Sequence, residues 1–168
     1  MNYHNITHED MLNGDGLRVV LWVSGCNHYC KNCQNPITWD INGGIPFDKN
    51  AIKEIVEELS KDYCSGITFS GGDPLHPENR KEILNIIENI IIPYFPNKTI
   101  WIYTGYKWEE LLDDEICNKI IRLIDVLIDG EYIQELNSPD KHWVGSSNQR
   151  VIDCKKSLAE NKIILKEN

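Results

Sequence analysis

The chain has 168 residues, with 17 Lys plus Arg against 26 Asp plus Glu, and a formal net charge of −9 at pH 7. Dedicated binding of nucleic acid or of an anionic membrane is therefore a poor expectation, because both need a basic surface. A composition with 41% hydrophobic and 26% charged residues excludes intrinsic disorder. We expect one domain over residues 1–168.

The predicted elements alternate between strand and helix. Short apolar runs bounded by turn residues predict strands over residues 18–23, 66–70, 99–103, 124–128 and, last and shortest, 151–152. Apolar residues at three- and four-residue steps predict helices over residues 48–63, 83–91, 107–123 and 155–162. Asp48 is expected to cap the first helix, and Pro93 to end the second. This alternation predicts the α/β class with parallel βα units.

The length limits which α/β architecture is possible. A complete barrel of eight βα units takes about 250 residues, so a chain of 168 residues supplies only a partial barrel or an open sheet. An incomplete barrel leaves one side open. The sequence contains no internal repeat and no linker long enough to divide it.

Six cysteines raise the question of compartment. No run approaches the ~20 apolar residues of a membrane span, and the first ten residues are polar and acidic, unlike a signal peptide. The chain is therefore expected to stay in the cytoplasm, where thiols remain reduced and serve as metal ligands, catalytic groups or buried side chains. Cys64, Cys117 and Cys154 are scattered singly, and we expect them only to pack.

The other three cysteines form the motif C-x3-C-x2-C directly after the first predicted strand. Cys26, Cys30 and Cys33 are one ligand short of a closed metal site. A structural zinc would need a fourth ligand, for which His28 is the nearest candidate. An iron–sulfur cluster would instead keep one iron open for a small molecule. The spacing alone leaves zinc and iron–sulfur open.

A second motif, Gly71-Gly72-Asp73-Pro74, follows the second predicted strand. Two glycines allow a ligand to approach the backbone closely, and Pro74 stops strand pairing because it has no N–H. Carbonyl groups exposed there can accept hydrogen bonds from an ammonium group. The alternative is a plain turn, since Gly, Asp and Pro are common turn residues.

Together the two motifs resemble those of the radical S-adenosylmethionine (SAM) enzymes. The resemblance implies a partial, open (βα) barrel of the radical-SAM type, with a mostly parallel sheet. It also implies that Cys26, Cys30 and Cys33 are the catalytic ligands of one [4Fe-4S] cluster, whose open iron is chelated by SAM. A Gly-Gly-Glu-Pro-like segment receives the methionine ammonium in that superfamily. Here Asp73 replaces the commoner Glu, which preserves the backbone role but puts any role of the longer side chain in doubt.

The match tightens to the activating enzymes of anaerobic (class III) ribonucleotide reductase, and covers roughly residues 1 to 153. The motifs that carry it are NGDGLR (13–18), the cysteine loop, NPITW (35–39), SGGDPL (70–75), WIYTGY (101–106), DVLIDG (125–130) and GSSNQR (145–150). The resemblance implies that a flavodoxin-like donor reduces the cluster and that SAM then yields a 5′-deoxyadenosyl radical. That radical would take a hydrogen atom from a glycine of the reductase's large subunit.

Four more residues are candidate cofactor contacts beside Gly71, Gly72 and Asp73. Asn32 and Gln34 flank the third cysteine, while Thr104 and Asp129 end predicted strands on the presumed active face. Ordinary loop polarity is the alternative for the first pair, and capping of a strand end is the alternative for the second.

Three other functions remain open at this point. The chain could activate another glycyl-radical enzyme of the formate-lyase type. It could be a radical SAM enzyme with a small-molecule substrate, although so short a chain has little room for a dedicated pocket. It could also be a zinc-binding interaction module without catalysis.

Overall fold

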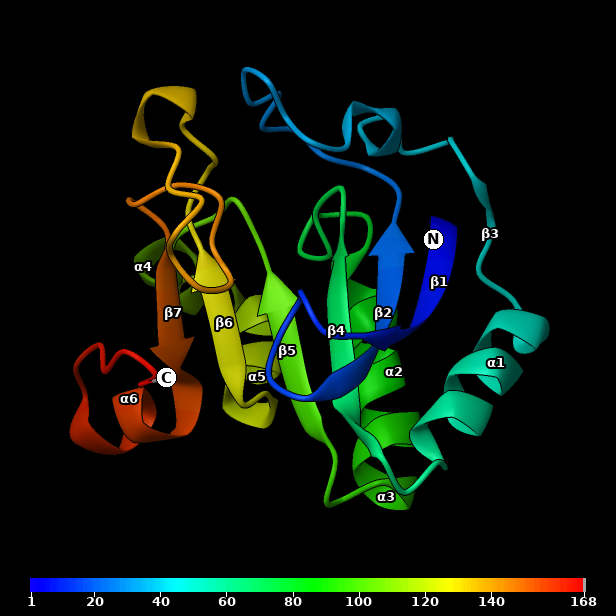
Figure 1. The fold of residues 1–168 in the computed structure, drawn as a ribbon. Helices are drawn as coiled ribbons and strands as arrows, with labels where there is room; N and C mark the ends of the chain where they lie inside the picture. The colour runs from blue at the N-terminus through cyan, green and yellow to red at the C-terminus, as the bar shows by residue number, and fades with distance from the viewer. Residues whose placement is uncertain (168) are drawn as a thin grey trace.

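Seven strands form one sheet in the computed structural model, which describes residues 1–167 (Figure 1). Their order from edge to edge is β3-β1-β2-β4-β5-β6-β7. The strands are β1 (Asn2–Asp10), β2 (Leu17–Val23), β3 (Ile45–Pro46), β4 (Cys64–Gly71), β5 (Thr99–Tyr103), β6 (Val126–Asp129) and β7 (Arg150–Asp153). The α/β class is confirmed. The sheet is open and mixed, because β2, β4, β5 and β6 are parallel whereas β1, β3 and β7 are antiparallel to their neighbours.

Most of the helices lie between strands in the sequence, and the last one follows β7. They are α1 (Lys49–Leu59), α2 (Arg80–Ile86), a π-helical turn (Ile87–Ile91), α3 (Ile92–Tyr94), α4 (Trp108–Leu112), α5 (Glu115–Leu123) and α6 (Cys154–Glu160). Two short 3-10 helices, η1 (Pro36–Thr38) and η3 (Gln134–Leu136), lie in loops. No helix within residues 1–167 has the length and apolar character needed to cross a bilayer.

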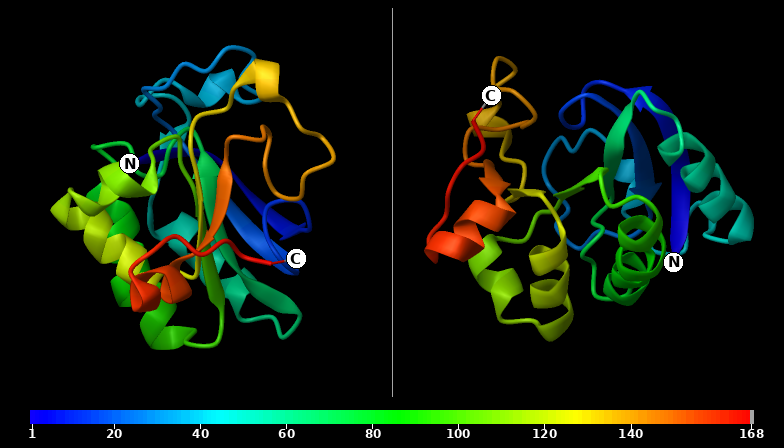
Figure 2. Two further views of the ribbon diagram at one scale, coloured as in Figure 1. Left: turned by 90° about the vertical axis from the view of Figure 1, so that its left-hand side faces the viewer. Right: turned by 90° about the horizontal axis from the view of Figure 1, so that it is seen from below.

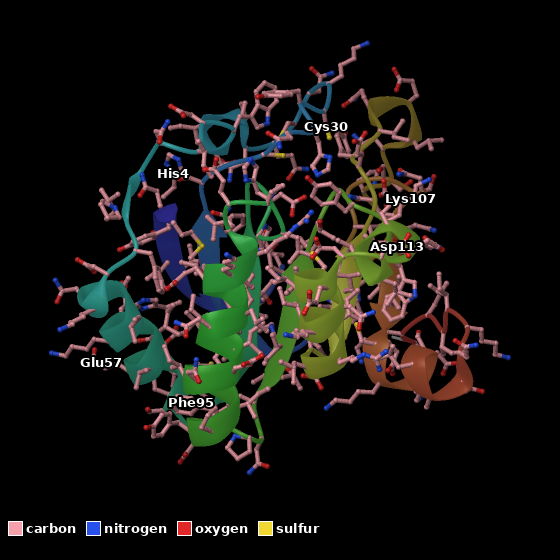
Figure 3. The ribbon with its side chains drawn as sticks, turned by 180° about the vertical axis from the view of Figure 1, so that it is seen from behind. His4, Cys30, Glu57, Phe95, Lys107 and Asp113 are labelled. Atoms are coloured by element: carbon pink, nitrogen blue, oxygen red, sulfur yellow. The ribbon has the colours of Figure 1, made fainter. Side chains whose placement is uncertain are left out.

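The parallel strands bring the two predicted motifs together. Val23 at the end of β2 is in register with Gly71 at the end of β4, so the cysteine loop and the glycine segment leave the same edge of the sheet. Seen from behind, Cys30 lies at this end of the molecule, and Phe95, which precedes β5, lies at the opposite end (Figure 3). This is the edge at which parallel α/β sheets place their ligands.

The two faces of the sheet carry different packing, because alternate residues of a strand point to opposite faces. Leu21, Ile67 and Phe69 belong to the main core, which the helices on one face complete (Figure 3). On the other face a smaller cluster forms around Trp101, Val126 and Ile128. The loop from β1 to β2 lies on this second face (Figure 2).

Arg18 is buried on this second face and joins three strands. Its guanidinium donates to Thr68 Oγ1 at 2.9 Å, to the Ile67 carbonyl at 2.9 Å and to the Thr99 carbonyl at 2.9 Å. It also lies over the Trp101 ring, 5.3 Å from the ring centroid. Burial lowers its pKa to about 10. Arg18 therefore ties together β2, β4 and β5 below the edge that bears the motifs.

The predicted elements differ from the observed ones in several places, one of which is the two-residue strand β3, which was not predicted. β1 was not predicted, because its residues are mostly polar and only Tyr3 and Ile6 are buried. The helix predicted over 107–123 is split into α4 and α5, and Asp114 caps the second by accepting a hydrogen bond from Cys117 N. Pro93 does not end its helix: it stands in the first turn of α3, after the π-helical turn, where a missing N–H is tolerated.

Other sequence predictions are confirmed. Asp48 caps α1, and its carboxylate accepts hydrogen bonds from Asn50 N and Ala51 N. Cys64, Cys117 and Cys154 are buried members of the main core, as expected for cysteines that only pack. Burial raises the pKa of the Cys117 thiol to about 12.

Candidate functional site

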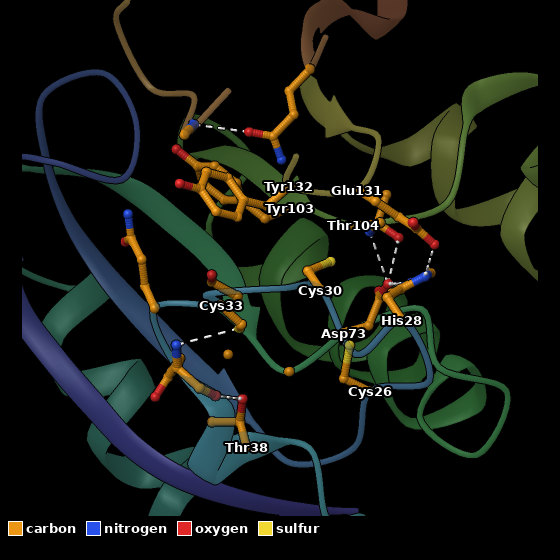
Figure 4. A pocket seen from close by; sticks show the side chains of 18 of the residues that line it. Cys26, His28, Cys30, Cys33, Thr38, Asp73, Tyr103, Thr104, Glu131 and Tyr132 are labelled. Carbon is orange, nitrogen blue, oxygen red and sulfur yellow. Dashed lines mark hydrogen bonds and ion pairs between the residues drawn. The ribbon is translucent and has the colours of Figure 1, made fainter. Parts of the chain in front are cut away.

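A cavity of about 590 Å³ opens at the carboxyl ends of the parallel strands. Its walls come from separate parts of the chain, namely the β1–β2 turn, the cysteine loop, residues 70–73, residues 103–105 and the segment after β6 (Figure 4). The described residues that line the cavity include three carboxylates, those of Asp10, Asp73 and Glu131, and one histidine, His28. No Lys or Arg is among these described residues. The cavity therefore favours a ligand with positive charge.

All three cysteines of the motif line this cavity, as Figure 4 shows. Cys26 is buried, whereas Cys30 and Cys33 are partly exposed. The loop that carries them includes Tyr29 and Asn32 in the left-handed region, with φ of 51° and 57°. Burial raises the pKa of the Cys26 thiol to about 11 and also raises that of Cys30. A ligand that binds thiolates must therefore release protons from these groups.

The two kinds of metal centre place different demands on the donor set. Within residues 1–167, no group of three or more His, Cys, Asp and Glu side chains is gathered closely enough to hold a metal ion. A zinc ion needs its ligands around one point. In a [4Fe-4S] cluster each cysteine binds a different iron, so the ligands surround a larger body. Three cysteines lining one cavity fit such a cluster.

The glycine segment is bonded to the start of the cysteine loop through its backbone. Gly72 N donates to the Val23 carbonyl at 2.9 Å, and Asp73 N donates to the Gly25 carbonyl at 2.7 Å. A Cβ atom on Gly72 would lie 2.5 Å from the Gly25 oxygen and 2.7 Å from the Thr38 oxygen. Gly72 is therefore required for the close approach of two backbone segments.

The Asp73 side chain is fully engaged by the protein. One oxygen, Oδ2, accepts from Thr104 Oγ1 at 2.9 Å and Gly105 N at 3.0 Å, and it contacts His28 Nε2 at 2.7 Å. The other oxygen, Oδ1, accepts from Leu75 N at 2.8 Å. The carboxylate is almost completely buried, with a relative exposure of 1%. Its bonds join the carboxyl ends of β4 and β5 to the cysteine loop.

His28 contacts a second carboxylate, because its Nδ1 lies 3.0 Å from Glu131 Oε1. Burial lowers the pKa of His28, but Asp73 and Glu131 outweigh burial and raise the pKa above its ordinary value. The sequence contains no signal for Glu131 except its place directly after the Asp129-Gly130 strand end. Gly105 was also missed, although it follows a strand end as well.

The remaining predicted residues separate into two groups. Gln34 and Thr104 line the cavity with the cysteines and with Gly71, Gly72 and Asp73. Asn32 is exposed and does not line it. Asp129 is buried outside the lining: its carboxylate accepts from Trp108 N at 2.8 Å and from Arg150 Nε at 3.0 Å. The contacts of Asp129 are those of a strand-end and helix cap.

Two tryptophans of the lining have buried indole N–H groups without a partner in the part of the chain described. These are Trp39 Nε1 and Trp143 Nε1. Trp39 packs edge-on against Tyr29 of the cysteine loop, with ring centroids 5.1 Å apart. An unpaired buried donor is costly, and neither N–H finds an acceptor within residues 1–167.

Comparison with known proteins identifies relatives of nearly the whole chain. Residues 12–152 match the family model described as a 4Fe-4S single cluster domain. The chain is 46% identical over 152 residues to the anaerobic ribonucleoside-triphosphate reductase-activating protein of Enterobacteria phage T4, which covers 90% of this chain and 93% of that protein.

Bacterial proteins of the same name are similarly close. The protein of Escherichia coli (strain K12) is 44% identical over 153 residues, covering 90% of this chain and 97% of its own. The protein of Haemophilus influenzae is 42% identical over 151 residues, which cover 89% of this chain and 96% of that protein. The range of the family model, residues 12–152, includes all three cysteines of the loop and the glycine segment.

Proposed function

The chain belongs to the family of anaerobic ribonucleoside-triphosphate reductase-activating proteins, and we propose that it installs a glycyl radical on the large subunit of such a reductase. It would act as one radical SAM domain in the cytoplasm, with a flavodoxin-like electron donor. The observation that carries the proposal is that Cys26, Cys30 and Cys33 line one cavity with Gly71 to Asp73.

The residues that would hold the cofactors follow from this geometry. Cys26, Cys30 and Cys33 would bind three irons of a [4Fe-4S] cluster. When bound and reduced, the cluster would supply one electron for the cleavage of SAM, and hydrogen-atom transfer from the target glycine would depend on that cleavage. The protein itself must bind, orient and shield the reacting groups.

The glycine segment offers backbone acceptors for the SAM ammonium. The Asp73 carbonyl already accepts from His76 N at 3.0 Å and Asn79 Nδ2 at 3.2 Å, and the carboxylate of Asp73 is engaged as well. The carbonyls of Gly71 and Gly72 are therefore the acceptors that we assign to the ammonium. The carboxylates in the lining and the absence of Lys and Arg from its described residues suit the positive charge of the sulfonium.

The other walls would exclude water from a reactive radical. Trp22, Tyr103 and Trp143 add aromatic surface to the lining. Tyr103 holds Trp143 in place, because the Tyr103 hydroxyl donates to the Trp143 carbonyl at 2.8 Å. The partial barrel of the radical SAM enzymes is the architecture that we assign to this open sheet.

A protein substrate fits the surroundings of the cavity. Leu12, Tyr29 and Ile37 are 81%, 61% and 69% exposed, and each lies in or next to a segment that lines the cavity. Large exposed apolar residues at a cavity mouth are typical of protein contact sites. We therefore assign the glycine-bearing loop of the reductase, rather than a small molecule, as the substrate.

Anaerobic reconstitution with iron and sulfide tests the proposal. The protein should become brown, absorb broadly near ~400 nm, and cleave SAM to methionine and 5′-deoxyadenosine when reduced. With the reductase large subunit, electron paramagnetic resonance (EPR) should show a glycyl doublet. Colourless protein with one zinc per chain would overturn the cluster assignment. A doublet formed only on a formate-lyase type enzyme would overturn the choice of partner.

A further inference from the structure

His28 joins three loops that follow three different parallel strands (Figure 4). It belongs to the cysteine loop after β2, contacts Asp73 after β4 at 2.7 Å, and contacts Glu131 after β6 at 3.0 Å. The His28 side chain is only 9% exposed, whereas that of Glu131 is 55% exposed. The buried contact with Asp73 is therefore the stronger of the two, because solvent screens it less.

The ring is also confined by packing. Tyr106 meets it edge-on, with ring centroids 4.6 Å apart. Gly105 also lies against the ring, because a Cβ atom there would come within 2.5 Å of the ring carbon Cδ2. Gly105 therefore supplies the space that the ring occupies. The position of His28 is therefore determined both by its polar contacts with the two carboxylates and by packing against Tyr106 and Gly105.

Asp73 cannot shift to follow the ring if His28 moves. Gly105 N and Thr104 Oγ1 hold its Oδ2, and Leu75 N holds its Oδ1. The contact between His28 and Asp73 consequently fixes the cysteine loop against the Gly71–Asp73 segment, which is itself held in place. The glycine carbonyls of this segment are the ones that we assign to the SAM ammonium.

His28 stands midway between two of the cysteines, two residues from each. The ends of the loop have backbone anchors, since Cys26 N donates to the Trp39 carbonyl and Cys33 N to the Cys30 carbonyl, each at 3.1 Å. Between Cys26 and Cys30, the side chain of His28 ties the loop to the rest of the site. A second, longer contact joins Asn27 Oδ1 to His76 Nε2 at 3.3 Å.

We propose that His28 is a positioning residue, which holds the cysteine loop in register with the Gly71–Asp73 segment so that cluster and SAM meet correctly. The inference rests on the proposed function. Both ring nitrogens already face carboxylates, so neither is available to ligate iron or SAM. Its effect must pass through the loop that it holds. Residues that orient metal ligands typically contribute 10- to 100-fold to affinity or activity.

The test compares reconstituted wild type with His28→Ala, His28→Gln and Glu131→Gln. Iron and sulfide content, the dissociation constant for SAM by equilibrium dialysis, and the EPR spectrum of the reduced cluster with and without SAM are measured. We expect His28→Ala to keep its iron but to weaken SAM binding about tenfold or more, with an altered spectral response to SAM. His28→Gln should recover part of the affinity, and Glu131→Gln should show a smaller loss.

His8→Ala is the matched control. His8 also lies between two carboxylates, Glu54 at 2.8 Å and Glu58 at 3.3 Å, but it packs against α1 outside the cavity lining. Its removal should leave SAM binding unchanged. If His28→Ala assembles no cluster, Glu131→Gln carries the comparison, because the Glu131 side chain is 55% exposed and its replacement should spare the fold.

Two results would overturn the positioning role. The first is that His28→Ala, His28→Gln and Glu131→Gln all bind SAM as tightly as the wild type and show the same spectral response to it. The other is a lowered thermal midpoint with an unchanged spectral response, which would mark a merely structural contact. Failure of the proposed function is distinct, since it appears in the wild type as absence of a cluster or of SAM binding.

Discussion

Gly105 and His28 are fitted to each other although they are far apart in the sequence: a Cβ atom at position 105 would lie 2.5 Å from Cδ2 and 2.6 Å from Nε2 of the imidazole. Tyr106 also packs edge-on against the ring, with ring centroids 4.6 Å apart. Any side chain at position 105 must therefore displace the group that contacts Asp73.

Gly105→Ala should lower the free energy of unfolding by roughly 1–3 kcal/mol, because overpacking forces the ring and its neighbours to move. Urea denaturation of the cluster-free protein measures it. In a His28→Ala background the same change should cost much less, since the ring is gone. Gly43→Ala is the control, because the nearest atom to its added Cβ is 3.2 Å away. Equal costs in both backgrounds would contradict the fit.

The six cysteines should separate into two classes by substitution. Alanine at Cys26, Cys30 or Cys33 should abolish the absorption near ~400 nm after reconstitution, because each is assigned to an iron. Alanine at Cys117 or Cys154 should keep the colour but lower the free energy of unfolding by about 0.5–3 kcal/mol, since both thiols are fully buried in the core. Iron analysis and thermal melting check the two outcomes. A brown Cys30→Ala protein would contradict the ligand assignment.

Asp129→Asn should act on stability rather than on SAM. The carboxylate caps α4 through Trp108 N and is paired with Arg150, which also contacts Glu109. Loss of its charge should cost about 1–3 kcal/mol, because the pair is only partly screened by solvent. The SAM dissociation constant of the reconstituted variant should equal that of the wild type. A large rise in that constant at unchanged stability would make Asp129 a cofactor contact.

Asp114 should contribute to the loss of folding stability at acidic pH. Its carboxylate accepts from Cys117 N at 2.9 Å and contacts Arg80 at 3.0 Å, and these interactions lower its pKa. A lowered pKa in the folded state gives stability above the unfolded pKa, which is lost as pH falls through the folded pKa. Asp114→Ala should cost about 1 kcal/mol at neutral pH. The difference from wild type should shrink as the pH falls below the folded pKa, as unfolding curves at a series of pH values will show.

The parallel strands were predictable because each is a short apolar run whose burial does not depend on the details of its neighbours. Thr99–Tyr103 is observed with the predicted bounds. β1 was not predictable in this way. Its residues NYHNITHED expose one face, and it becomes a strand because β2 and β3 pair with it on both sides.

The same distinction applies to the site. The cysteine motif and the Gly71-Gly72-Asp73 segment could be recognised from their own residues and spacing. The parallel pairing of β2 and β4 then brings them to one edge of the sheet. Glu131 and Gly105 could not be recognised in this way, since nothing in their own segments shows which side chain they will meet. The role of Asp73 also changed, from a residue valued for its backbone to a carboxylate that joins two strand ends to the cysteine loop.

The sequence by itself thus determined the fold class, the cysteine loop and the family, because these depend on local composition and spacing. Only the tertiary structure decided that His28 lies between Asp73 and Glu131, residues 45 and 103 positions away. Contacts between side chains so distant in sequence depend on strand order and register. Those are set by the packing of the whole sheet and not by any single segment.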